Sequence, residues 1–282
     1  MSQFLPGLAL EIVRLSAWLA LLMVIFAPLE KRFALRKTQP FFRRAFGADV
    51  AFYYLSSLLP KLVLLMPLSF FAGLAHQAMS AGLYEWVAAL PVWTRLLAAL
   101  LVGEIGAYWG HRWSHQFPLL WRFHAIHHGA EDMDWLINTR AHPVDMVFTR
   151  LCGLVPMYLL GLAQPMANQL DIVPVLVTVI GTIWGFFIHA NLNWRFGRLE
   201  WLIATPAFHH WHHTNDGAAV ANQNYAAVLP WIDRCFGTFY LPKEKWPERY
   251  GTDTPPSPTV AGQLLQPFLP ADQPSAYIDS RG

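Results

Sequence analysis

The sequence predicts an all-α membrane protein, in which about five apolar spans, four to five of them crossing the bilayer, support a cytoplasmic helical cap. Of the 282 residues, 55% are hydrophobic and 13% are charged, whereas an ordinary soluble domain carries about 25% charged residues. The hydrophobic residues gather into five long runs, and eleven of the twelve histidines fall between positions 111 and 213. This composition favours a membrane protein, and nothing in it indicates a nucleic-acid partner.

The first apolar run covers residues 4–29, and the loop after it sets the expected orientation. Residues 31–44 contain six lysines or arginines and no acid. Because basic loops of this kind stay in the cytoplasm, we expect this loop on the cytoplasmic side and the N-terminus on the other.

Four further apolar runs follow, at residues 51–75, 92–109, 144–163 and 172–190. Each suits the roughly 20 residues that a helix needs to cross hydrocarbon. The segment between the third and fourth runs is too polar to span, and we expect it at the membrane interface. The last two runs form an even pair of passes, which would place all the clustered histidines on the cytoplasmic side.

Three histidine patterns occur in this region. They are HRWSH at 111–115, HAIHH at 124–128 and HHWHH at 209–213. On a helix, residues three or four apart share a face, so each pattern can direct several imidazoles at one point. A single histidine in an apolar setting is usually an ordinary packed residue, but three such patterns in one chain predict a metal site.

The number of histidines predicts a dinuclear site. Imidazole binds zinc, copper, iron and nickel, and eight imidazoles exceed what one ion needs. The zinc-protease pattern HExxH is absent. Two rival functions remain open at this point. A histidine-rich metal transporter would place ligands along its spans, and a haem-binding electron carrier would pair histidines across two helices.

The three patterns resemble the histidine boxes of the fatty acid hydroxylase and sterol desaturase superfamily, which comprises integral-membrane di-iron oxygenases. The flanking segments resemble those of bacterial members: RAHPVD around His142, FIHANLN around His189 and NYAAVLPWIDRCFGTF from Asn224. The resemblance covers about residues 100–240. It implies a helical membrane fold that holds two metals beneath a cytoplasmic cap and oxidises lipids with dioxygen.

The resemblance also implies a ligand set. Eight box histidines are implied as metal ligands: His111, His115, His124, His127, His128, His209, His212 and His213. His189 matches a further histidine that some members use. Four positions later, where other members have a second histidine, this chain has Asn193, and His142 is the candidate replacement. His210 is the extra histidine of its box, and we expect it to point away from the metals.

Acids and amides near the boxes are candidates for orienting the histidine rings, because a ligating imidazole needs a partner for its second nitrogen. The candidates are Asp145, Asp216, Asn224 and Asp233. Helix capping or a surface position is the alternative interpretation of each.

Glu104 lies within the third apolar run, on one helical stripe with Tyr108, His111 and His115. An acid inside a span is costly, and it marks a functional site by default. It is expected to orient a ligand or to line the substrate path, and an ion pair with Arg95 or Lys61 is the alternative. Outside the histidine set, the candidate catalytic residues are therefore Glu104, Asn193 and Asp233.

The expected function is that of a membrane-bound, non-haem di-iron oxidoreductase that uses two iron ions and dioxygen. It would hydroxylate or desaturate a fatty acyl, sterol or related lipid that enters from the bilayer. Neither an HPGG segment nor a GxGxxG fingerprint occurs, so we expect a separate electron-transfer protein as the partner. We divide the chain into N-terminal spans with a basic loop (1–91), a catalytic domain (92–250) and a proline-rich tail (251–282).

Overall fold

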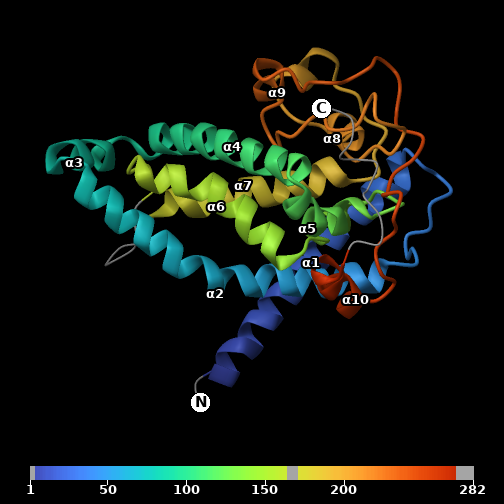
Figure 1. The fold of residues 1–282 in the computed structure, drawn as a ribbon, viewed down its shortest axis with the longest axis horizontal. Helices are drawn as coiled ribbons and strands as arrows, with labels where there is room; N and C mark the ends of the chain where they lie inside the picture. Colours follow the sequence, from blue (N-terminus) through green and yellow to red (C-terminus); the bar gives the residue numbers. More distant parts are fainter. Residues whose placement is uncertain (1–3, 164–170, 271–282) are drawn as a thin grey trace.

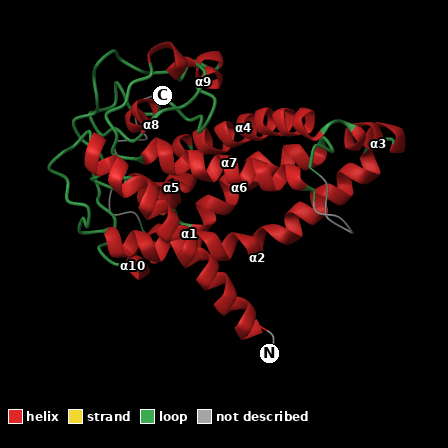
Figure 2. Ribbon diagram, turned by 180° about the vertical axis from the view of Figure 1, so that it is seen from behind, coloured by secondary structure: helices red, strands yellow, loops and turns green. Residues whose placement is uncertain are grey.

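The computed structural model describes residues 4–163 and 171–270. Its longer helices are α1 (Phe4–Phe33), α2 (Phe46–Ala78), α3 (Ala81–Ala89), α4 (Val92–Gln116), α5 (Pro118–His128), α6 (Pro143–Leu159) and α7 (Ile172–His189). The shorter ones are α8 (Pro206–His212), α9 (Trp231–Cys235) and α10 (Val260–Leu265), with 3-10 turns η1 (Trp135–Thr139), η2 (Gly197–Trp201) and η3 (Gln266–Phe268). The described residues form no strand beyond one isolated bridge, as Figure 2 shows, so the all-α prediction is confirmed.

Three helices are long and apolar enough to cross a membrane, namely α1, α2 and α7. A fourth span results if α3 and α4, which meet at a bend of 107°, count as one. The chain is thus a membrane protein, but the prediction of about five spans is not confirmed. The run at 144–163 forms α6, whose 17 residues lie at the lower end of the range for a crossing helix, and it is not among these candidate spans.

The helices α2, α4, α6 and α7 lie lengthwise in one bundle, and the first half of α1 projects away from it (Figure 1). Glycines bring α4 and α6 into close contact. A Cβ atom on Gly106 would lie 2.1 Å from the carbonyl oxygen of Cys152, and one on Gly110 would lie 2.7 Å from the Cβ of Cys152. Because backbone atoms occupy that space, a larger residue at Gly106 would force the two helices apart.

Most of the loops gather at one end of the bundle with α8 and α9, while α3 lies at the other end (Figure 1). The basic loop is fastened to the first of these ends by buried ion pairs. The Arg43 guanidinium pairs with Asp134 and Asp49, and Asp49 also pairs with Arg140. The Glu30 carboxylate accepts hydrogen bonds from the backbone of Trp135 and of Asn191. We call the segments outside the bundle at this end, residues 117–142 and 191–250, the cap, and the basic loop lies beside it.

Within the proline-rich tail, residues 251–270 pack against the bundle through α10 and η3, which contact α2 and α5 respectively. The rest of that predicted region, 271–282, lies outside the described residues.

Candidate metal centre

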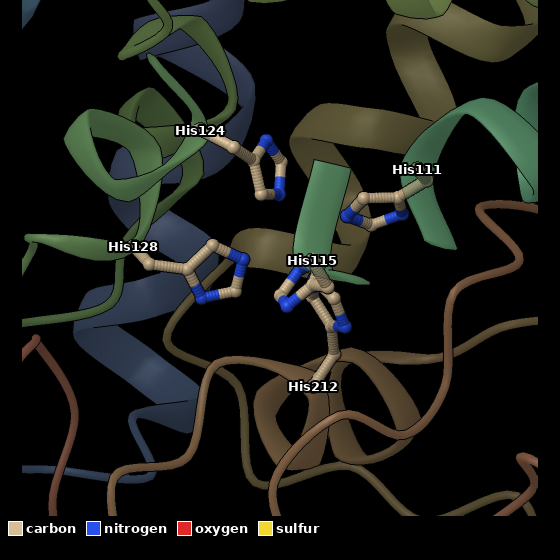
Figure 3. A group of neighbouring side chains, drawn as sticks. All are labelled: His111, His115, His124, His128 and His212. Carbon is tan, nitrogen blue, oxygen red and sulfur yellow. The ribbon is translucent and has the colours of Figure 1, made fainter. Parts of the chain in front are cut away.

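Nine histidines form two groups whose ring nitrogens could each hold a metal ion. The five-histidine group consists of His111, His115, His124, His128 and His212. The four-histidine group consists of His127, His189, His209 and His213. In each group the ligand atoms lie within 4.8 Å of one another. Figure 3 shows the rings of the five-histidine group directed toward a common centre from α4, α5 and α8.

Helical spacing explains how the boxes are shared. In the second box, His124 and His128 lie four apart on α5 and enter the five-histidine group, whereas His127 turns to the other group. In the third box the arrangement is reversed. There, His209 and His213 enter the four-histidine group, and the intervening His212 enters the five-histidine group. Each HxxHH pattern therefore supplies both groups, because its middle histidine lies about 100° around the helix from its neighbour.

The two groups touch. The rings of His128 and His213, one from each group, stack with their centroids 4.3 Å apart and an angle of 21° between their planes. His127 and His128 are also in ring contact, with centroids 5.4 Å apart. The two groups are therefore adjacent parts of one histidine cluster and not separate sites.

Hydrogen bonds at Nδ1 set the direction of six of the nine rings. The His124 Nδ1 is 3.0 Å from the carboxylate of Asp145, and that of His115 is 3.2 Å from the amide oxygen of Asn222. The other four Nδ1 atoms are bonded to the backbone carbonyls of Tyr225 (from His111), Arg140 (from His127), Gly185 (from His189) and Gln223 (from His212). With Nδ1 engaged, Nε2 is the atom left to bind a metal, as is usual for ligating histidines.

The free nitrogens fit a metal. The Nε2 atoms of His124, His128 and His212 are buried with no hydrogen-bond partner, an arrangement that is costly in the absence of a ligand. In the four-histidine group, the Nε2 of His189 is 3.3 Å from that of His127 and 3.0 Å from that of His209. Two imidazole nitrogens at such a distance are both suited as ligands of one ion between them.

The histidines of the cap are held in the uncharged form that binds metals. Burial, followed by the neighbouring imidazoles, lowers the pKa of His127 and of His128 well below the ordinary value. Burial has the same effect on the pKa of His212 and of His213. At neutral pH these rings are therefore available as ligands without the loss of a proton.

Two of the predicted site residues are not brought to these groups. The Nδ1 of His142 accepts a hydrogen bond from the Val144 backbone, and its Nε2 donates to the Leu264 carbonyl, so this histidine caps α6. Asn193 is exposed, and its backbone N–H donates to the carbonyl of Phe33.

His210 also lies outside both groups, as expected for the extra histidine of its box. Its Nδ1 accepts a hydrogen bond from the Tyr250 hydroxyl, and its Nε2 donates to the Ala190 carbonyl. Burial lowers the pKa of His210 to about 4. This neutral ring joins the end of α7 to the cap.

Glu104 and Asp233 act on one segment of the cap rather than on a histidine directly. The Glu104 carboxylate accepts hydrogen bonds from the backbone N–H groups of Val228 and Leu229. The Asp233 carboxylate accepts from Tyr225 and Ala226. These bonds fix the carbonyl of Tyr225, which lies 2.8 Å from the Nδ1 of His111. Arg95 pairs with Asp171 instead of with Glu104, and the Lys61 side chain lies outside the described residues.

The remaining candidates for orienting rings differ in their positions. Asn224 adopts a φ of 61°, and its side chain bonds to the backbone of Phe208 and Tyr240, so it joins the segment after the third box to α8. The Asp216 carboxylate accepts from the backbone of Glu248 and Arg249, away from the histidines. Asp145 is the candidate that touches a ring.

A cavity of about 870 Å³ adjoins the histidines. Its walls come from α1, α2, α4, α6 and α7, and it reaches five of the clustered rings: His111, His124, His127, His189 and His209. Glu104 also lines it. Such a mainly apolar space inside a helix bundle is typical of a site for an apolar ligand.

Sequence reasoning missed two polar residues of this cavity, Asn138 and Arg150. The Asn138 side chain fits against α7 because position 185 is glycine, where a Cβ atom would lie 2.4 Å from its amide oxygen. In the sequence, the glycines at 181 and 185, four positions apart in the last apolar run, are the feature that could have indicated a close contact here. Arg150 carried the same signal as Glu104, a charged residue within an apolar run, but this signal was not followed.

Comparison with known proteins agrees with this geometry. The family described as fatty acid hydroxylase matches residues 96–238, about half of the chain. The chain belongs to the fatty acid hydroxylase family. The resemblance inferred from the histidine boxes is thereby confirmed.

Individual relatives cover the same region. The chain is 33% identical over 198 residues to the ornithine lipid hydroxylase OlsE of Rhizobium tropici, covering 70% of this chain and 57% of the relative. It is 33% identical over 154 residues to the alkylglycerol monooxygenase of Xenopus tropicalis and 31% identical over 153 residues to that of Homo sapiens, in each case 54% of this chain and 32% of the relative. The match thus spans less than two thirds of each relative. No solved structure matches the chain.

Proposed function

We propose that this protein is a membrane-bound di-iron oxygenase that oxidises a lipid with dioxygen and with electrons from a separate electron-transfer protein. The observation that carries the proposal is the pair of touching histidine groups at the end of a cavity in the bundle. The relatives named as a lipid hydroxylase and as monooxygenases favour hydroxylation over desaturation.

In this proposal the nine clustered histidines bind two iron ions, and His142 and Asn193 are not ligands. Imidazole accepts several metals, so the choice of iron rests on the family and not on the geometry. When bound, the metal pair supplies the activation of dioxygen. Asp145 and the backbone carbonyls hold the imidazoles in the orientation that binding requires.

The chain's own contribution to the reaction is to hold the lipid and to exclude water. Apolar residues of α2, α4 and α7, such as Leu64, Leu100 and Ile188, line the cavity that leads to the histidines. A lipid chain in this cavity would place a C–H bond beside His127, His189 and His209. Fixing the reacting bond in this way accounts for part of the rate that an enzyme achieves.

The histidine groups are proposed to face the cytoplasm. The support is that the basic loop, whose charge favours the cytoplasm, is fastened to the same end of the molecule through Arg43 and Asp134. Cysteines introduced at Ala218 in the cap and at Gly82 in α3, in a background without Cys152 and Cys235, test this orientation. Both positions are exposed. Ala218→Cys should react from the cytoplasmic side only, and Gly82→Cys from the other. The reverse pattern would invert the topology.

Metal analysis together with an optical spectrum separates this proposal from its rivals. The purified protein should hold about two metals per chain and show no haem absorption. In a metal transporter we would expect ligands along the spans, whereas here they gather at one end of the bundle. Zinc or manganese transport by vesicles containing the protein would support the transporter.

Activity is tested with iron-loaded protein, a reductant, dioxygen and a total lipid extract, followed by mass spectrometry. We expect a lipid that gains one oxygen atom from isotopically labelled dioxygen, and no such product with His127→Ala. A reproducible content of one metal or none, with no labelled product, would overturn the proposal.

A further inference from the structure

The cavity wall contains one guanidinium whose role the proposed reaction does not explain. Arg150 lies on α6 among the residues that line the cavity. The neighbouring wall positions on this helix are Met146, Thr149, Gly153 and Met157. Spacings of three and four place these residues on one helical face, so Arg150 belongs to the stripe that faces the cavity.

The other charged groups of the wall are already satisfied. The Asp145 carboxylate contacts Ser114 and His124, and the Glu104 carboxylate accepts two backbone N–H groups. Among the described residues, by contrast, no carboxylate forms an ion pair with Arg150, whose side chain is exposed and thus open to a ligand. A guanidinium on the wall of a mainly apolar cavity, with no carboxylate partner, is available to an anionic group of a ligand.

We propose that Arg150 binds an acidic group, a carboxylate or a phosphate, on the lipid that occupies the cavity. The guanidinium fork is suited to two parallel hydrogen bonds to such a group. This inference rests on the proposed function for the identity of the cavity as the lipid site. It adds that the substrate is an acidic lipid and not a neutral one.

The position of Arg150 suits this role. Five residues separate it from Asp145, which corresponds to about 7.5 Å along the helix axis. Asp145 in turn contacts the ring of His124. An acidic group held at Arg150 would thus lie one to two helical turns from the histidines, and the apolar walls would receive the chain. Arg150 is a positioning and specificity residue in this arrangement.

Binding of matched lipids tests the proposal. The protein, loaded with zinc so that no turnover occurs, is placed in nanodiscs of zwitterionic phosphatidylcholine. The probes are hexadecyl phosphate, palmitate and hexadecanol, which share one chain length and differ in charge. For Arg150→Gln we expect about 10- to 100-fold weaker binding of both acidic probes and unchanged binding of hexadecanol. Arg150→Lys should be intermediate.

Two control variants locate the effect. Arg198→Gln removes an exposed arginine of the cap and should change nothing. Gly181→Leu should weaken all three probes alike, because Gly181 lines the cavity and a Cβ atom there meets no other atom within 4 Å. The added side chain would therefore occupy space that the lipid needs. Unchanged binding of the acidic probes to Gly181→Leu would place them outside the cavity and overturn the proposal.

Three other outcomes would also overturn the proposal. If Arg150→Gln weakens the binding of acidic and neutral probes equally, Arg150 has only a structural role. If it weakens the binding of neither, Arg150 has no role in lipid binding. If phosphatidylglycerol in the nanodisc displaces the acidic probes from the wild type but not from Arg150→Gln, the arginine binds bilayer head groups, which also overturns the proposal. Because the readout is binding to zinc-loaded protein, failure of these tests is distinct from failure of iron-dependent oxidation.

Discussion

The five-histidine group and the four-histidine group differ in what holds their rings. In the five-histidine group, His124 is held by the carboxylate of Asp145 and His115 by the amide of Asn222. In the four-histidine group, the Nδ1 atoms of His127 and His189 contact backbone carbonyls. A side-chain substitution can therefore disturb the first group selectively, whereas the orientation of the second is part of the backbone fold.

The number of ligands is the coarsest difference between the groups, and it predicts the largest effect. Removal of His189 leaves the four-histidine group with three rings, whereas removal of His115 leaves the other group with four. We expect His189→Ala to lower the metal content from about two per chain toward one, because the group keeps only three ligands, the fewest that catalytic zinc sites use, and has no spare. His115→Ala should retain more metal.

Metal analysis after dialysis against a chelator measures this difference, and turnover should be lost in both variants. Equal metal loss in the two variants would show that the fifth ligand of the five-histidine group does not increase metal retention.

Loss of the orienting carboxylate should have a smaller effect, confined to the five-histidine group. In Asp145→Asn the side chain keeps its shape but no longer polarises the His124 ring. Changes of this kind typically reduce metal affinity or activity about 10- to 100-fold. Competition with a chelator should show one weakened metal and one unchanged metal per chain. Asp216→Asn, a carboxylate that bonds the backbone away from the histidines, is the matched control. Weakening of both metals would contradict separate control of the two groups.

A substitution of Glu104 tests whether the backbone segment that orients His111 can be disturbed by a residue that does not contact the ring. In Glu104→Gln the amide oxygen can take the place of Oε1, which accepts both backbone N–H groups, but hydrogen bonds to a neutral acceptor are weaker than those to a carboxylate. We expect a loss of about 1–3 kcal/mol in the free energy of unfolding, read as a lower melting temperature, with lower turnover and most of the metal retained. Glu85→Gln, at an exposed position on α3, should be neutral. Unchanged stability in Glu104→Gln would show that the cap segment is held by Asp233 alone.

The smallest expected effect concerns the backbone that holds the four-histidine group. A Cβ atom on Gly185 would overlap the Asn138 side chain, whereas one on Gly181 meets nothing within 4 Å. Gly185→Ala should cost about 1 kcal/mol, the lower end of the range for overpacking, because the Asn138 amide can shift. Gly181→Ala should cost nothing by this mechanism. Thermal unfolding of the two variants side by side measures the difference, and equal melting temperatures would remove Asn138 from the argument.

The sequence was a good guide to the helices and to the gathering of the histidines. Hydrophobic runs and helical spacing are local properties, and both survive folding. The distribution of the boxes between two groups was not predictable in this way, because His127 and His212 join groups that depend on how α5 and α8 face each other. The position of His142 also depends on a partner distant in sequence, the carbonyl of Leu264. Without knowledge of this contact, the sequence made His142 a candidate ligand.

The span predicted at 144–163 is not confirmed, for a comparable reason. Hydropathy does not distinguish a helix that faces lipid from one that packs among other helices. Helix α6 packs against α2 and α4, and its apolar residues are explained by that packing and by the cavity. The same ambiguity concealed Arg150, whose environment is formed by residues from several other helices.

The sharing of each histidine box between both groups sets the order in which the protein can mature. The chain is synthesised from its N-terminus, so α4 and α5 exist before α8. Since each group needs rings from both α5 and α8, neither can be completed until synthesis has passed His213. In the proposed function, metal insertion is therefore a late event in biogenesis, and the first two boxes are made before the ligands that α8 supplies.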